Sequence, residues 1–165
     1  MYLDVSQLVL NNGAVMDINT KVKLEDFEFN GQKLHFNDCV HIEGSISNVS
    51  GTLVMKAKAS VDFVTQCSRC LDDINISIAF DIDEAFSKTA SGDADEIIII
   101  NSDEIDMVEV AEKNLCSQLP INYLCSDDCK GLCPLCGCNL NKQTCDCEDD
   151  YIDPRLAVLK NFLDK

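Results

Sequence analysis

The sequence has only two histidines, His35 and His41, among 165 residues. Both alternate with apolar residues in a segment expected to be a strand, which places them on its polar side. The sequence contains no glycine-rich phosphate loop and no nucleophile paired with a base in a known motif. Catalytic zinc sites usually include a histidine and keep one coordination position open. This scarcity of activated groups indicates that the protein is not an enzyme.

Long apolar runs are also missing. The β-branched run from Ile97 to Ile100 is far too short to span a bilayer, and Met1 to Thr20 has neither a basic start nor a sustained apolar stretch. We therefore expect no membrane segment. A cytoplasmic location, or an equivalent reducing compartment, follows from the same observation.

Basic side chains are few, because 13 lysines and arginines face 29 acidic residues, which gives a formal charge of −16. Such a field repels phosphate backbones and disfavours direct RNA binding. Lys21, Lys23, Lys56 and Lys58 could form a local basic face, but lysines on strands are more typical of a solvated surface. The charge favours a protein partner, and a basic one in particular.

Cysteine is abundant instead. Seven of the eleven cysteines lie between Cys125 and Cys147. Disulfide frameworks belong to oxidising compartments and usually use thiols in pairs, whereas this chain has an odd number of cysteines and no visible export signal. The thiols therefore point to bound metal.

A metal knuckle is predicted at Cys133 and Cys136, here called the knuckle pair, because two intervening residues let one turn aim both sulfurs at a single ion. Gly137 can adopt the positive φ that the chain often needs on leaving such a turn. Cys145 and Cys147, the last pair, complete a tetrahedral set after a short loop. All-cysteine sets are typically closed and structural, so we expect a structural zinc ion here.

A second zinc site is expected to use Cys67 and Cys70, the upstream pair, which lie at a turn between two strands. That setting is a poor match to a thioredoxin motif, whose cysteines open a helix. Cys125 and Cys129, the middle pair, would supply its other half. The main alternative joins the upstream pair to the knuckle pair and leaves the middle and last pairs to each other or to no metal. One or two structural zinc ions are thus predicted.

Three cysteines remain outside these pairs. Cys116 lies beside the apolar face of a predicted helix and is expected to be a small core residue. Cys39 precedes His41 on a strand, and we assign it no metal role. Cys138 follows Cys136 by two residues and could replace a neighbouring ligand or exchange with one on oxidation.

The first hundred residues predict a β-rich region. Residues 52–64 alternate between apolar and polar side chains, and residues 74–82 repeat the pattern after the upstream pair, so two long strands should bracket that turn. Further strands are expected at residues 2–10, 22–29 and 34–46, with turns at 11–13, 30–31 and 48–51. The run Ile97 to Ile100 should close or edge the sheet.

Two helices are predicted after the strands. Apolar residues recur at helical spacing from Met107 to Leu119, with Asp106 as N-cap and Pro120 as the stop. A last helix should start at Asp153. We therefore predict an α+β fold: an antiparallel β-sheet curled into a sandwich or partly open barrel, with a zinc-binding cysteine-rich C-terminal region and two helices. The expected domains are 1–104, which is β-rich, and 105–165, whose last helix packs on the β-domain.

The chain carries an ordered series of motifs: CSRCL from Cys67, the helix ending in Leu119 and Pro120, CKGLCPLCGCNLN from Cys129, CDC from Cys145 and DPRLAVLK from Asp153. Together these motifs resemble the YceD family of large ribosomal RNA subunit accumulation proteins. The resemblance implies a non-enzymatic factor that promotes accumulation of large-subunit (23S) ribosomal RNA, in ribosome biogenesis.

The partner that this resemblance implies is a ribosomal protein or a precursor of the large subunit. Arg69, on the turn of the upstream pair, is a candidate contact residue, and its alternative role is a hydrogen bond to local carbonyls. A rival function is a thiol-redox sensor or redox-switched chaperone, in which oxidation of zinc-bound cysteines releases the metal and exposes apolar surface.

Overall fold

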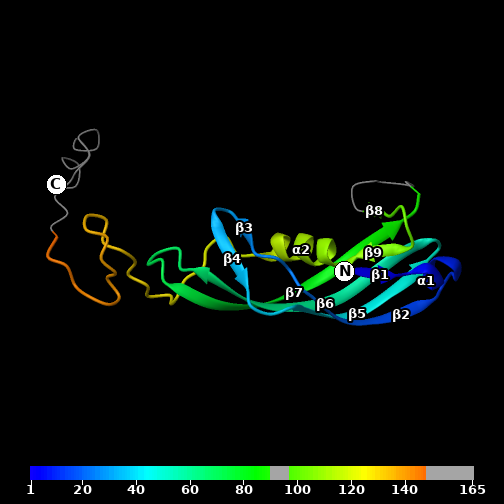
Figure 1. Ribbon diagram of the computed structural model, residues 1–165, viewed down its shortest axis with the longest axis horizontal. Coiled ribbons are helices and arrows are strands. Elements are labelled where there is room, and N and C mark those ends of the chain that lie inside the picture. Colours follow the sequence, from blue (N-terminus) through cyan, green and yellow to red (C-terminus); the bar gives the residue numbers. More distant parts are fainter. Residues whose placement is uncertain (90–96, 148–165) are drawn as a thin grey trace, which may run out of the picture.

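The computed structural model describes residues 1–89 and 97–147 of the chain. The molecule is elongated, with a curved sheet over most of its length and the cysteine-rich segment at one end (Figure 1). No helix within the described ranges is long and apolar enough to cross a membrane. The helix expected from Asp153 lies outside the described residues.

The described elements follow one another as β1 (Tyr2–Asp4), α1 (Ser6–Leu10), β2 (Val15–Val22), β3 (Phe27–Phe29), β4 (Gln32–Phe36), β5 (Val40–Val49), β6 (Thr52–Gln66), β7 (Asp73–Ser87), β8 (Ile97–Ile99), β9 (Glu104–Asp106) and α2 (Met107–Gln118).

Strands β6 and β7 form the centre of the sheet. They pair antiparallel from Leu53 opposite Phe86 to Gln66 opposite Asp73. Along β6 every second side chain from Leu53 is buried, which confirms the period of two in the sequence. The predicted pair of long strands around the upstream cysteines is therefore confirmed.

The remaining strands extend this centre on both sides. The first half of β6 pairs with β5, which in turn pairs with β2. On the same side, the second half of β6 pairs with β4, which forms a hairpin with β3. On the other side, β8 joins β7 in parallel, so Ile97–Ile99 edges the sheet as expected. All other pairings are antiparallel, and β1 and β9 form a separate two-stranded sheet.

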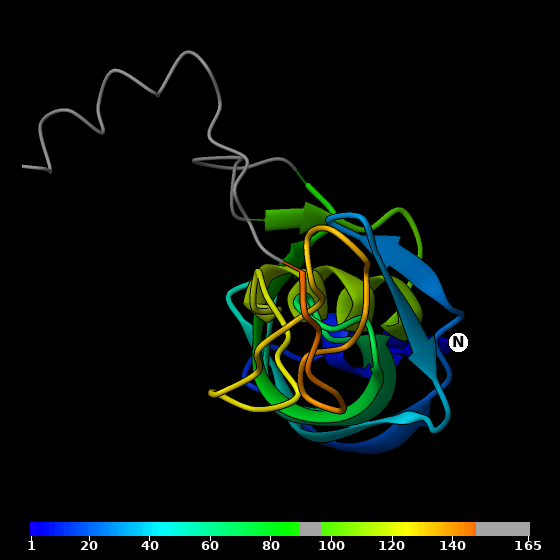
Figure 2. The ribbon, with the colours of Figure 1, turned by 90° about the vertical axis from the view of Figure 1, so that its left-hand side faces the viewer.

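The sheet is strongly curved, and Figure 2 shows it curling around α2 when viewed along the long axis. It is not a closed barrel, because among the described strands β8 at one side pairs with neither β2 nor β3 at the other. At one point β5 passes very close to β6. A Cβ built on Gly44 would lie 2.3 Å from the carbonyl oxygen of Lys56. Glycine is therefore required here because any side chain would clash with the backbone of β6, and not because the backbone has a positive φ.

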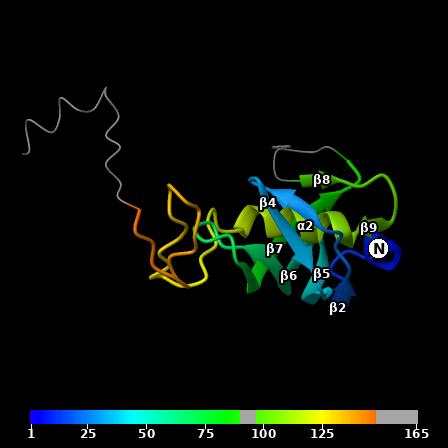
Figure 3. The same ribbon diagram turned by 60° about the vertical axis from the view of Figure 1, so that its left-hand side comes forward.

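Helix α2 fills the hollow of the sheet (Figure 3). Its buried residues Met107, Ala111 and Leu115 belong to the same core as β5, β6 and β7. Asp106 accepts a hydrogen bond from the backbone N–H of Val108 at 2.9 Å, as expected of an N-cap, and the helix ends before Leu119. The division into domains 1–104 and 105–165 stays a prediction.

One charge is buried in this hollow. The carboxylate of Glu84 on β7 accepts bonds from Asn114 Nδ2 at 2.8 Å and from Lys113 Nζ at 2.9 Å. These partners offset the cost of removing the carboxylate from water. The pair also fixes how α2 is rotated against the sheet.

Three strand predictions near the N-terminus were wrong in their limits. The strand expected at 2–10 ends at Asp4 and continues as α1, whose Leu8 is buried. The strand expected at 22–29 is replaced by the end of β2 and by β3, and the one expected at 34–46 is broken between Phe36 and Val40. The predicted turns at 30–31 and 48–51 do connect strands, with positive φ at Asn30 and Ser50.

Candidate metal centres

The turn between β6 and β7 positions the upstream pair. Cys67 donates its backbone N–H to the carbonyl of Asp72 at 2.8 Å, and Leu71 donates to the carbonyl of Cys67 at 3.0 Å. Leu71 adopts a positive φ of 60°, which lets the chain turn back into β7. Cys67 and Cys70 are both buried under this turn.

The middle pair reaches this turn because the chain after α2 is attached to it. Pro120 ends the helix, and Tyr123 then exchanges two bonds with Ser68: Ser68 N–H donates to the Tyr123 carbonyl at 2.8 Å, and Tyr123 N–H donates to Ser68 Oγ at 3.1 Å. The chain continues directly to Cys125 and Cys129. Two segments far apart in the sequence thus meet at the end of the sheet.

The first cluster consists of the upstream and middle pairs. Its four sulfurs lie within 4.8 Å of one another. Cys67 Sγ is 3.8 Å from Cys129 Sγ, and Cys70 Sγ is 3.7 Å from Cys125 Sγ. These distances exclude disulfides, in which the sulfurs are about 2.05 Å apart. Tetrahedral bonds of about 2.3 Å to one ion place sulfurs about 3.8 Å apart, so the cluster fits a closed four-thiolate site.

Hydrogen bonds to sulfur favour the thiolate at two of these residues. Burial alone would raise the pKa of the Cys67 thiol, but backbone N–H groups, led by that of Cys70, lower this pKa to about 6. Burial also opposes ionisation of Cys129, yet the Nδ2 group of Asn141, 3.3 Å from the sulfur, lowers its pKa. Both sulfurs are therefore prepared to bind a cation.

The other two thiols of the cluster hold their protons. The backbone N–H of Asp72 favours the thiolate of Cys70, but burial and the neighbouring sulfurs outweigh it and raise the pKa of Cys70 to about 12. The sulfur of Cys129, together with burial, raises the pKa of Cys125. Four negative charges cannot crowd together without a cation, so an ion bound here must displace these protons.

Polar side chains around the first cluster tie the cysteine-rich segment to the turn. Arg69 Nη1 donates to the carbonyls of Cys129 at 3.0 Å and Asp127 at 3.5 Å. Asp72 accepts bonds from Asn139 Nδ2 at 2.9 Å and Lys142 Nζ at 2.8 Å. The predicted alternative for Arg69, a hydrogen bond to local carbonyls, is therefore present.

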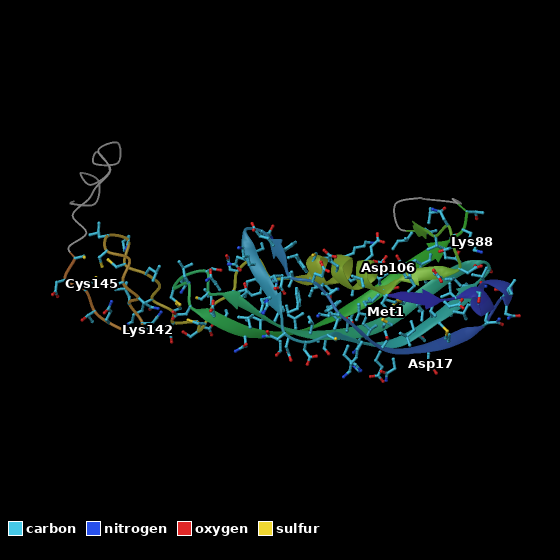
Figure 4. The ribbon with its side chains drawn as sticks, viewed as in Figure 1. Met1, Asp17, Lys88, Asp106, Lys142 and Cys145 are labelled. Carbon is cyan, nitrogen blue, oxygen red and sulfur yellow. The ribbon has the colours of Figure 1, made fainter. Side chains whose placement is uncertain are left out.

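The second cluster consists of the knuckle and last pairs, whose four sulfurs also lie within 4.8 Å of one another. Gly137 donates its N–H to the carbonyl of Cys133 at 2.9 Å and has a φ of 73°, as the knuckle requires. The backbone N–H groups of Cys136 and Leu135 lower the pKa of Cys133 to about 6. Figure 4 places Cys145 and Lys142 at the far end of the molecule.

The two clusters differ in exposure. Three of the four cysteines in the first are buried, whereas Cys136 and Cys147 of the second are exposed and only Cys133 is buried. The sulfur of Cys136 raises the pKa of Cys147 to about 12 and that of Cys138 to about 12. Cys138 therefore lies beside the second cluster without belonging to its set of four.

The structure brings the eight predicted ligands together in the favoured grouping. The structure does not bring the upstream pair and the knuckle pair together, as the alternative required, because these pairs lie in different clusters. That the eight residues bind metal stays a prediction. Cys39 and Cys116 are half-buried and belong to neither cluster.

The other candidate residues lie on the sheet, away from the clusters. His35 is exposed and pairs with Asp26. Two of the four lysines face acidic residues: Lys56 is opposite Asp83, with an ion pair of 3.5 Å, and Lys58 is opposite Asp81. Carboxylates on β7 therefore neutralise the basic positions on β6.

Sequence reasoning missed the supporting residues Asp72, Asn139, Asn141 and Lys142. Asn139 and Asn141 fall within CGCNLN and directly follow the knuckle pair. Two asparagines at this position were the sequence feature that could have predicted side-chain bonds supporting the cysteine-rich segment. Asparagine side chains often bond to nearby backbone groups in turns, and Asn141 Oδ1 accepts from the N–H of Lys130 at 2.8 Å.

Comparisons with known proteins agree with the motif series. Residues 55–163 match the family model described as large ribosomal RNA subunit accumulation protein YceD. Uncharacterized proteins of Mycobacterium bovis and Mycobacterium tuberculosis are each 24% identical to this chain over 99% of its length and 81% of their own. The chain is also similar to a chloroplastic protein of Arabidopsis thaliana named large ribosomal RNA subunit accumulation protein YCED homolog 1. The two are 36% identical over a segment that covers 36% of this chain and 18% of the relative. No solved structure gave a significant match.

Proposed function

We propose, because this chain belongs to the YceD family, that it is a non-enzymatic factor that promotes accumulation of large-subunit (23S) ribosomal RNA. The observation that carries the proposal is the family match over residues 55–163, which spans both cysteine clusters. The name of the Arabidopsis relative describes the same role for that protein. The chain would act during assembly of the large subunit or in protection of its precursor.

Zinc is the metal that we propose for the two clusters. Four thiolates in a compact tetrahedral set suit zinc, whereas hard cations such as magnesium and calcium prefer oxygen ligands. A closed set leaves no coordination position for a substrate, so the ions would be structural. This agrees with a protein that acts by binding rather than by catalysis.

A ribosomal protein or a precursor particle is the proposed partner. The formal charge of −16 opposes direct contact with RNA, and the lysines of β6 face acidic residues of β7. Ribosomal proteins are basic, so an acidic surface attracts them and repels the RNA around them. Direct RNA binding would be recognised by an affinity for ribosomal RNA that falls steeply with salt.

Depletion of the protein in its source organism tests the function. We expect the ratio of large-subunit to small-subunit ribosomal RNA to fall and the large-subunit peak of the gradient profile to shrink. Expression of the wild-type chain should restore both. An unchanged ratio and profile in depleted cells would contradict the proposal.

Complementation then tests whether the metal sites are needed. Cys67→Ser removes a buried ligand of the first cluster, and Cys39→Ser removes a half-buried thiol outside both clusters. We expect Cys39→Ser to restore the ribosomal RNA ratio and Cys67→Ser to restore it poorly. Equal complementation by both variants would show that the first site is dispensable for function.

The exposed second cluster favours one alternative function, a thiol-redox sensor or redox-switched chaperone. Cys136 and Cys147 are exposed, and the spare thiol of Cys138 lies beside them. A peroxide could oxidise two thiolates to a disulfide, with its own reduction to water, and so release the ion. Thiols and released zinc would be titrated together under mild peroxide, and an ion that stays bound would exclude this function.

A further inference from the structure

Strand β8 has an open edge. It pairs with β7 in parallel through residues 85–87, and within the described parts of the chain no strand pairs with its other side. Ile100 donates its backbone N–H to the carbonyl of Ser87 at 2.9 Å. Because successive backbone groups point to opposite sides of a strand, Ile98 also faces β7 and the N–H of Ile99 points to the free edge. An unpaired edge of this kind is a template for an added strand.

An apolar groove of about 210 Å³ lies beside this edge, between β8 and the start of α2. Its floor is part of the core, because Phe86, Ile105 and Val110 are almost completely buried. Its walls are accessible: Ile99 is 45% exposed and Tyr2 is 66% exposed. The groove can therefore receive an apolar side chain from an adjacent strand.

The rim of the groove is acidic. Glu104 and Glu109 contribute carboxylates, whereas the carboxylate of Asp106, whose position Figure 4 marks, is paired with the N-terminal ammonium group at 3.4 Å. Lys113 also lines the groove, but its ammonium group is bound to Glu84 at 2.9 Å. The rim therefore attracts a cationic ligand.

We propose that β8 and this groove bind an extended segment of a basic protein, which adds a strand to the sheet and places an apolar side chain in the groove. This inference deepens the proposed function, because it assigns the contact with a basic protein partner to a defined surface. Added-strand recognition of this type draws affinity from backbone bonds and specificity from pockets for alternate side chains.

Charge distinguishes this partner from a second copy of the chain. Two chains of formal charge −16 repel each other, and their acidic rims would face at a shared edge. Strand β2, at another open edge of the sheet, carries outward-facing side chains of both signs, Asp17 and Lys21. The acidic rim therefore favours β8 as the binding edge.

The test uses the full zinc-loaded chain and a fluorescent synthetic peptide of alternating lysine and valine, with binding followed by fluorescence anisotropy. Ile99→Pro removes the outward N–H but leaves the pairing of Ile98 and Ile100 with β7, since proline is tolerated on the solvent side of edge strands. We expect affinity for the peptide to fall about tenfold. Ile99→Val keeps the N–H and should bind as the wild type does, and a thermal melt would verify folding of both variants.

A second pair of variants tests the rim without touching the strand. Glu109 lines the groove, whereas Glu112, also exposed on α2, does not. Glu109→Gln should weaken peptide binding about twofold to threefold, and Glu112→Gln should leave it unchanged. Equal effects of the two variants would mean that the peptide senses only net charge, and would overturn the proposal.

Two further outcomes would overturn it. One is unchanged peptide affinity in folded Ile99→Pro. The other is a wild-type dimer in sedimentation that Ile99→Pro dissociates, because a second copy would then occupy the edge. This experiment also separates the β8 proposal from the proposed function. If Ile99→Pro fully rescued depleted cells, the β8 edge would not be needed for function, but the role in ribosomal RNA accumulation would stand.

Discussion

Removal of metal should disorder residues 124–147 while the sheet survives. This segment has almost no core of its own: its buried residues are Cys129, Gly131 and Cys133, two of which are candidate ligands. By contrast, the sheet and α2 share one large apolar core that contains none of the ligands. The order of the segment therefore depends on the clusters.

The size of the effect of metal removal is found by comparing the zinc binding energy with the other contacts that hold residues 124–147 in place. The bond from Leu132 N–H to the Arg69 carbonyl, at 3.2 Å, contributes about 1 kcal/mol, and the bonds from Arg69 are of the same order. The ion pair of Asp72 with Lys142 is exposed and screened by solvent. Structural zinc in small peptides is worth about 10–16 kcal/mol near neutral pH. The metal thus exceeds the other attachments several-fold, and its loss should leave the segment unfolded.

Amide hydrogen exchange can follow this change residue by residue. The N–H groups of Leu132, Cys133 and Leu140 are hydrogen-bonded in the segment, and those of Ala57 and Ala59 in β6 serve as internal controls. After chelation and verified metal removal, the three segment amides should exchange at nearly the rate of a free peptide, while both controls stay protected. Protection of all five amides after metal loss would refute the reasoning.

Three further predictions concern the sheet and the ligands. Gly44→Ala should destabilise the protein by about 3 kcal/mol in urea unfolding, because its Cβ would overlap the backbone of β6. Asn114→Ala should cost about 2 kcal/mol in the same assay, because it leaves buried Glu84 with one partner fewer. Binding of a divalent ion to the first cluster at pH 7 should release protons, including those of Cys70 and Cys125, whose pKa values are raised. Calorimetry in buffers of different ionisation enthalpy measures this release, and the affinity should rise as pH increases from 7 toward 12.

Matched controls separate these effects from general perturbation. Ser45→Ala changes the residue next to Gly44 without adding a Cβ and should alter stability by less than about 0.5 kcal/mol. Ser117→Ala removes a bond on the exposed side of α2 and should be equally mild. Cys39→Ser should leave proton release unchanged, because that thiol belongs to neither cluster. A Gly44→Ala variant as stable as Ser45→Ala would contradict the close approach of β5 and β6.

The parts of the fold with a long, regular pattern could be predicted from the sequence. Alternation over a dozen residues located β6, and the helical spacing after Asp106 located α2 and its cap. The favoured grouping of the eight cysteines also matched the structure, because short intervening loops restrict which sulfurs can meet.

Short elements were beyond such reasoning. Helix α1 has five residues, too few to display a period of 3.6, and its position depends on distant Asn48, whose Nδ2 donates to the Leu8 carbonyl at 2.6 Å. At the break between β4 and β5, the N–H of Phe36 donates to Asp26, ten positions earlier, at 3.0 Å. The contacts of Asp72 with the cysteine-rich segment likewise join residues about seventy positions apart, and no local pattern encodes them.

Native mass spectrometry of the intact, reduced protein tests the central claim most directly, namely that eight cysteines form two closed four-sulfur sites. We expect a mass increase of two zinc ions in the wild type, one ion in Cys67→Ser and one in Cys133→Ser, with both ions retained in Cys116→Ser. A wild-type protein that carries no zinc when purified under reducing conditions with zinc present, or loss of both ions in each ligand variant, would contradict the account.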